Sequence, residues 1–242
     1  AGGDVVITAG LGDTATGGAM YLTTGSGTGT SSGDMELLTA STTVGVTGWM
    51  IFSSGIATSG SSGHVTVGSG AATNGPAGGI SVIVGHSNSG VGSPLKMRAG
   101  GVTDGTGTTG GAVSINSGQG LTSGGALWLQ SGIGQGATSG HVLLASGSGT
   151  VKSSGHIIVR TANAGGVGVS GDLTFSSGTT LSGNTGHVRI GSGLSTKGTG
   201  GSISVTVGSG DTSTGGSITV AAGRARSTGN DGGAITVTAG RG

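Results

Sequence analysis

The sequence predicts an all-β fold: a single parallel β-solenoid of about sixteen coils that occupies residues 1–242 as one domain. Three observations predict it. Apolar residues recur at two fixed places in a repeat of about fifteen residues, glycine recurs at fixed places between them, and the composition excludes most other fold classes. Two glycine positions in each coil suggest two corners, because glycine tolerates sharp bends. We therefore expect a flattened solenoid with two sheets, whose handedness the sequence does not fix.

The repeat consists of a variable residue, an apolar residue, any residue, a second apolar residue, any residue, a small residue and glycine, followed by a Gly/Ser/Thr-rich stretch. Numbered 1 to 16 along the chain, the repeats begin at Asp4, Ala19, Asp34, Trp49, His64, Gly79, Pro94, Ala112, Ala126, His141, His156, Asp172, His187, Ser202, Ser217 and Ala234. Most successive starts are therefore fifteen positions apart. Repeats 7, 11 and 15 are longer, and repeat 8 is one residue shorter.

The second and fourth positions are apolar in all sixteen repeats. Two apolar residues separated by one residue lie on the same face of an extended strand, whereas a helix would need a spacing of three or four. We call these positions the core columns and expect them to face one shared, narrow interior. Twelve residues that represent the core columns are Val5, Ile7, Met20, Leu22, Met50, Phe52, Val142, Leu144, Leu173, Phe175, Ile235 and Val237.

The other half of each repeat is rich in Gly, Ser and Thr, and it predicts a second strand of small residues opposite the core columns. Thr28, Thr43, Thr58 and Thr73 share the tenth position and form a candidate stack on that strand. The extra residues of the longer repeats fall in this half, where they should bulge without disturbing the columns. Residues 92–111, which include Pro94 and three extra residues, are the segment expected to be most irregular.

The composition limits the function classes. Glycine accounts for 62 of the 242 residues, charged residues for 7% and aromatic residues for 2%, and cysteine is absent. Collagen is excluded because glycine does not recur at every third position. The formal net charge of +1 gives no electrostatic reason to bind nucleic acid. No apolar run is long enough to span a membrane.

The titratable residues predict no catalytic, cofactor or metal site, and the chain is not expected to be an enzyme. Asp34 and Glu36 form the one close carboxylate pair, and no partner base accompanies them. His141 and His156 share the first position of successive repeats and should stack outward, but zinc needs three or four ligands. The short coils, the scarce carboxylates and the lack of aromatic platforms also argue against a β-helix enzyme that acts on carbohydrates, since those enzymes have longer coils and acidic or basic clefts.

Large apolar residues at outward positions suggest contact with a partner, since a contiguous exposed apolar patch often marks an interface. We expect lateral packing against another rod, with coverage by another part of the same protein or no role as the alternatives. The candidate lateral contacts are Trp128, Leu143 and Ile158 in successive repeats, and Val6, Tyr21, Leu38, Trp49 and Ile51 near the start.

The repeat pattern runs from Asp4 to Val237 without atypical end repeats. This predicts either a segment of a longer chain or a subunit that stacks end to end in a filament. Over its whole length the chain resembles the Gly/Ser/Thr-rich β-solenoid repeats of secreted and surface proteins. Pattern and resemblance together favour a structural, non-catalytic rod module of an extracellular filament, fibre or adhesin. Its expected partners are copies of itself, and O-linked glycan on Ser and Thr remains open.

Ice binding is the alternative function. The chain is similar to ice-binding solenoids in its period and its threonine content, and those proteins carry a regular Thr-x-Thr row on a flat face. Outward pairs that approach this motif occur in the last repeats, as in Ser204/Thr206 and Thr236/Thr238. Earlier pairs such as Lys96/Arg98 interrupt the row, although a threonine array on the second sheet remains open.

Overall fold

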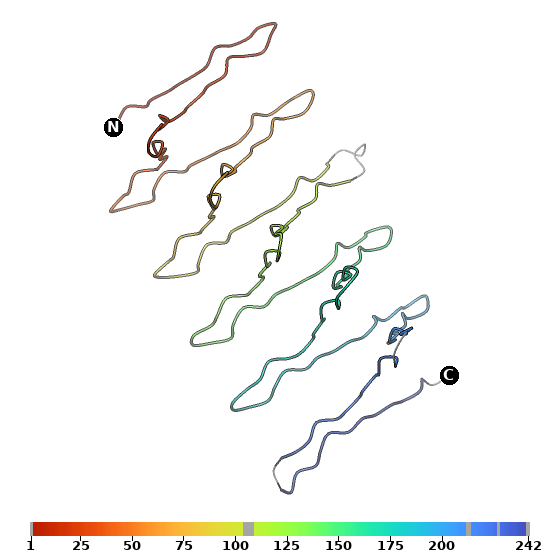
Figure 1. Ribbon diagram of the computed structural model, residues 1–242. Coiled ribbons are helices and arrows are strands. Elements are labelled where there is room, and N and C mark those ends of the chain that lie inside the picture. The colour runs from red at the N-terminus through yellow and green to blue at the C-terminus, as the bar shows by residue number, and fades with distance from the viewer. Residues whose placement is uncertain (1, 104–108, 212–213, 227, 241–242) are drawn as a thin grey trace. The chain divides into compact units, whose positions relative to one another are not determined.

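The computed structural model (Figure 1) describes residues 2–103, 109–211, 214–226 and 228–240. Its contacts divide the chain into two parts, Ala1–Asn116 and Ser117–Gly242, which are described separately. Within the described residues there is neither an α-helix nor a β-strand, and stretched segments alternate with loops that bend at their tips. Those residues accordingly contain no helix that is long and apolar enough to cross a membrane.

The predicted all-β parallel solenoid, flattened between two sheets, is wrong, and the terms β-solenoid and β-helix do not describe this chain. No described residue belongs to a strand, and none is buried. The physical reason is that alternation of apolar residues gives an extended segment one apolar face but does not make it a strand. A strand also needs a neighbouring segment, about 4.8 Å away, with which its backbone exchanges hydrogen bonds. The pattern identifies the segments but does not supply that neighbour.

The exposed surface shows how little the chain buries. The solvent-accessible area is 24194 Å². A compact monomer of this mass, 22.2 kDa, would expose about 9400 Å², and a fully unfolded chain about 32000 Å². The single chain therefore buries only about a quarter of the surface that an unfolded chain exposes.

The fifteen-residue repeat is nevertheless visible in the backbone. Each repeat consists of a segment formed by its first six residues and a loop that starts at the seventh residue and ends at the last. In repeat 1 the Gly18 N–H donates a hydrogen bond of 2.9 Å to the Gly10 carbonyl, which joins the two ends of the loop. Equivalent bonds of 2.9 to 3.0 Å close the loops of repeats 2, 8, 9 and 10.

Differences in repeat length are confined to these loops. In repeat 7 the closing bond joins Gly111 to Gly100 at 2.9 Å, and in repeat 15 it joins Gly233 to Gly223 at 2.8 Å, although both loops contain extra residues. Residues 104–108, within the segment expected to be irregular, lie outside the described residues. The closing bond is therefore kept while the loop inside it changes in length.

One class of loop depends on glycine at the ninth position. A side chain there would place its Cβ within 3.0 Å of a loop carbonyl oxygen, closer than real Cβ atoms come. Only glycine therefore fits without a shift of the backbone. We call these the tight loops, and all five have the closing bond. Their ninth residues are Gly12, Gly27, Gly120, Gly134 and Gly149.

A second class, which we call the open loops, has at the ninth position a Ser or Thr whose hydroxyl bonds the carbonyl two residues ahead, in repeats 3, 6 and 12. In repeat 3 the Thr42 hydroxyl donates to the Val44 carbonyl at 2.8 Å, and Gly45 follows with φ of 100°. The same bond links Thr180 to Ser182 in repeat 12 at 3.1 Å. Such local side-chain bonds compete with backbone pairing, and the left-handed φ at Gly45 favours glycine.

The predicted second strand is absent from the described residues. Thr28, Thr43, Thr58 and Thr73, the candidate stack, each lie at the start of a bent loop tip and are exposed. This prediction was wrong because a glycine-rich stretch of small residues can form a bend as readily as a strand. Glycine also has no side chain that could pack in a strand.

Candidate functional site

The core columns meet at the corners where one repeat passes to the next. In the second part of the chain, a Cβ built on Gly186 would lie 3.7 Å from the Ser177 Cβ, so the two ends of that loop are close. Phe175 precedes Ser177 by two residues, and Val188 follows Gly186 by two residues. Side chains two residues apart lie on one face of an extended segment. The fourth residue of one repeat and the second residue of the next therefore face the same side of the corner.

A hollow confirms this geometry at the corner between repeats 12 and 13. Phe175, Val188, Arg189 and Ile190 line an open hollow of about 390 Å³. Three of these four residues belong to the core columns. The hollow is therefore apolar on most of its wall and open to solvent.

The two ends of the chain show where the partial burial of the columns comes from. Fifteen of the sixteen second-position residues are 47 to 58% exposed, but Val5 in the first repeat of the sequence is 89% exposed. Fourth-position residues in repeats 1 to 15 are 55 to 78% exposed, but Val237 in the last repeat is 92% exposed. Each second position is therefore shielded by the repeat before it, and each fourth position by the repeat after it.

All members of the core columns are more than a third exposed, so the described chain has no hydrophobic core. This holds for every residue named above to represent the columns: Val5, Ile7, Met20, Leu22, Met50, Phe52, Val142, Leu144, Leu173, Phe175, Ile235 and Val237. The columns form two regular series of uncovered apolar side chains. We treat them as the candidate functional site, because repeated exposed apolar groups are typical of an interaction surface.

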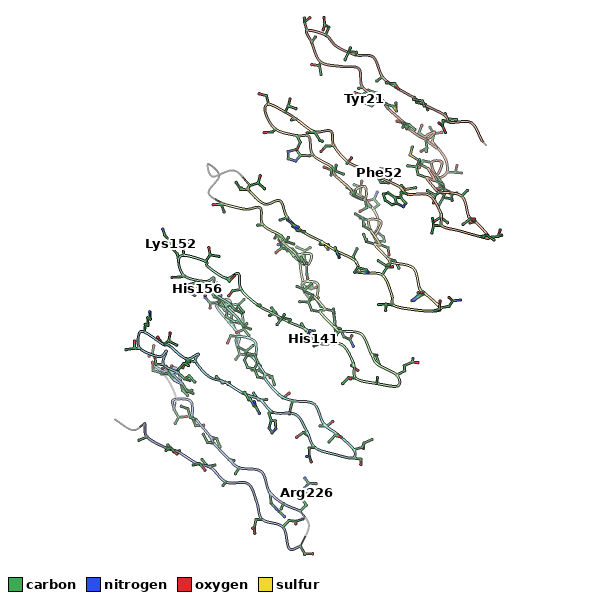
Figure 2. The ribbon with its side chains drawn as sticks, turned by 180° about the vertical axis from the view of Figure 1, so that it is seen from behind. Tyr21, Phe52, His141, Lys152, His156 and Arg226 are labelled. Carbon is green, nitrogen blue, oxygen red and sulfur yellow. The ribbon has the colours of Figure 1, made fainter. Side chains whose placement is uncertain are left out.

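The candidate lateral contacts are more exposed than most second-position residues. Their exposed fractions run from 74% at Ile51 to 88% at Tyr21, which is labelled in Figure 2. The stripe expected from Trp128, Leu143 and Ile158 requires successive repeats to stack directly, and it stays a prediction. The exposed residues of this set are Val6, Tyr21, Leu38, Trp49, Ile51, Trp128, Leu143 and Ile158.

The polar candidates do not converge in the part of the chain that the structure describes. His141 and His156, expected to stack, lie on well separated stretches in Figure 2. The closed loop between Gly147 and Gly155 explains this, since His141 begins the segment that leads into the loop and His156 begins the segment that leaves it. Asp34 and Glu36 are both exposed. The described residues contain no group of three or more His, Cys, Asp or Glu that could hold a metal ion.

A second hollow, of about 270 Å³, is lined by the consecutive residues Arg160, Thr161, Ala162 and Asn163. Its polar groups come from one stretch of backbone, and no residue from another segment lines it. General acid–base chemistry needs a positioned acid and base. The four lining residues contain neither a carboxylate nor a histidine.

Comparisons with family models, with curated proteins and with solved structures found no match.

Two features of the site were missed by the sequence analysis. The pairing of the fourth position of one repeat with the second position of the next follows from loop closure, which the residue pattern alone does not reveal. The distinction between tight and open loops had a visible signal, because the ninth position varies mainly between glycine and Ser, Thr or Ala.

Proposed function

We propose that this chain is a structural, non-catalytic module that becomes ordered by assembling with copies of itself into an extracellular fibre or filament. The observation that carries the proposal is that every member of the core columns is exposed in the single chain. Burying one such side chain contributes roughly 1.5 to 3 kcal/mol. Ordering one residue of backbone costs roughly 1 to 2 kcal/mol. A single chain with this little burial does not offset that cost, so the order has to come from other chains.

The charge distribution supports association of copies with each other. Nine basic and eight acidic residues give a formal charge of +1, so two copies do not repel each other strongly. No core-column position carries a charge. The proposed extracellular location rests on composition and on the resemblance to secreted repeat proteins.

The proposal is tested by adding a charge to a column. Val142→Asp changes the second position of repeat 10, and Thr150→Asp adds the same charge to the loop of that repeat. We expect the wild-type chain to form large particles in sedimentation velocity and elongated ones in electron micrographs. The column variant should raise the concentration needed for assembly at least about tenfold, because it loses apolar burial and would bury a carboxylate.

The loop variant Thr150→Asp should assemble like the wild type. A wild-type chain that stays monomeric at all accessible concentrations would contradict the proposal. Monomers that depress the freezing point of water below its melting point would instead favour the ice-binding alternative.

A further inference from the structure

Among the residues that the structure describes, the six-residue segments have no backbone–backbone hydrogen bonds to one another. Each backbone–backbone hydrogen bond found in the described residues, where no strand is present, joins the two ends of a loop through its first and last glycine. Every residue other than proline carries one backbone donor and one acceptor, and an unpaired group that becomes buried costs about as much as a lost hydrogen bond. Burial of the core columns therefore requires a neighbour that also pairs the segment backbone.

We infer that this neighbour is a second copy of the same chain, lying parallel and in the same register, so that each segment pairs with the identical segment of the other copy. The inference rests on the proposed self-assembly and adds to it the partner's orientation and register. A stable protein–protein interface buries about 1600 Å² in total. The chain exposes 24194 Å², so the area available for such an interface is ample.

The intervals between segments limit which partner can pair with all of them. Segments recur at a constant interval, except where repeats of other lengths intervene between Pro94 and Ala126, after His156 and after Ser217. A partner that pairs with all segments must present its own segments in the same order and with the same interruptions. A second copy in register does so by construction.

The loops exclude the shifted registers. Tight loops occur in repeats 1, 2, 8, 9 and 10, and open loops in repeats 3, 6 and 12. A shift of one repeat would place the tight loop at Gly27 beside the open loop at Thr42. An antiparallel copy would mismatch the loops as well. Only the unshifted parallel arrangement sets every loop beside one of its own length and class.

The electrostatic cost of pairing two copies in register is small. In register, a charged residue at a segment position, such as Lys96 or Arg98, lies beside its own copy. Both residues are exposed, and charges in contact with water interact weakly and are screened by salt. The chain has few such positions, since charged residues make up 7% of it.

Cysteine cross-linking tests the register, because the natural chain contains no cysteine. Thr66→Cys and Thr219→Cys place single thiols at the third position of repeats 5 and 15, outside the core columns. Parallel strands lie about 4.8 Å apart, which suits a disulfide. On oxidation of the assembled full-length chains, each variant alone should become mostly covalent dimer. A mixture of the two, distinguished by mass, should give same-site dimers and almost none of the mixed dimer.

Abundant mixed dimers, or assembled chains without cross-links, would overturn the register while leaving self-assembly intact. A wild-type chain that does not sediment as an assembly would overturn both. A second measurement needs no substitution, since Tyr21 is the single tyrosine. Solid-state NMR of assembled chains with ¹³C at the Tyr21 carbonyl should give an intermolecular distance of about 5 Å. An isotope-diluted sample is the control, and absence of that coupling would contradict the inference.

Discussion

At the scale of single residues, the ninth position of a repeat distinguishes the tight loops from the open loops. In the tight loops it is glycine, the backbone passes so close to a loop carbonyl that no Cβ fits, and the loop ends are joined by a hydrogen bond. Where it is Thr42 or Thr180, the hydroxyl instead bonds a carbonyl two residues ahead. Glycine and a hydroxyl side chain at the same position thus accompany two different loop conformations.

This account predicts a difference between two glycines of one loop. Gly134→Ala in repeat 9 should lower the stability of the assembled chain by about 1 to 2 kcal/mol, because its Cβ would clash with the Ala137 carbonyl. Gly136→Ala is the matched control, since a Cβ there meets nothing within 4 Å, and it should change stability by less than about 0.5 kcal/mol. Urea denaturation of the assembled chains measures both. Equal effects would show that the close approach at Gly134 does not matter.

At the scale of the repeat, segments and loops respond differently to a change of length. The closing bond persists in loops whose ends are seven, eight, ten or eleven residues apart, as in Gly125–Gly118 and Gly111–Gly100. The segments have no such freedom, because adding one residue moves every following side chain to the opposite face. The repeat therefore keeps the parity of the segment fixed and leaves the loop free to vary.

Two insertions in repeat 10 test this difference. Three residues, Gly-Ser-Gly, added after Thr150 should cost less than about 1 kcal/mol of assembly free energy, since loop closure depends weakly on length. One serine added after Val142 should abolish assembly, because it turns Leu144 away from the face that it shares with Val142. Sedimentation velocity compares the two variants. If both assemble equally, segment parity is not what holds the chains together.

The sequence predicted part of this organisation. The repeat starts, the two apolar columns and the placement of extra residues in the glycine-rich half all follow from local composition, and the backbone shows loops at those places. The absence of strands was not predictable, because a strand requires a hydrogen-bonded neighbour and the residues of Val142–Ser146 contain no information on which chain supplies it. Corner pairs such as Phe175 and Val188 became apparent only once the loop ends were seen to meet.

At the scale of the whole molecule, the sequence has the apolar pattern of a hydrophobic core, but none of the described residues is buried. Its area of 24194 Å² lies nearer to that of an unfolded chain than to that of a compact monomer. Core-column residues are partly shielded from solvent by the neighbouring repeat. Val5 and Val237, in the first and last repeats of the sequence, are more exposed than the other members of their columns. The proposed self-assembly makes order over longer distances depend on other copies, so we expect folding and assembly to occur together.

Hydrogen exchange measured against protein concentration tests this dependence most directly. Below the concentration at which sedimentation equilibrium detects assembly, amides of the six-residue segments, such as 141–146, should exchange at rates close to those of an unfolded chain. Above it they should become strongly protected together, while the loop tips remain open to exchange. A monomer whose segment amides are protected to the same degree at every concentration would contradict the account.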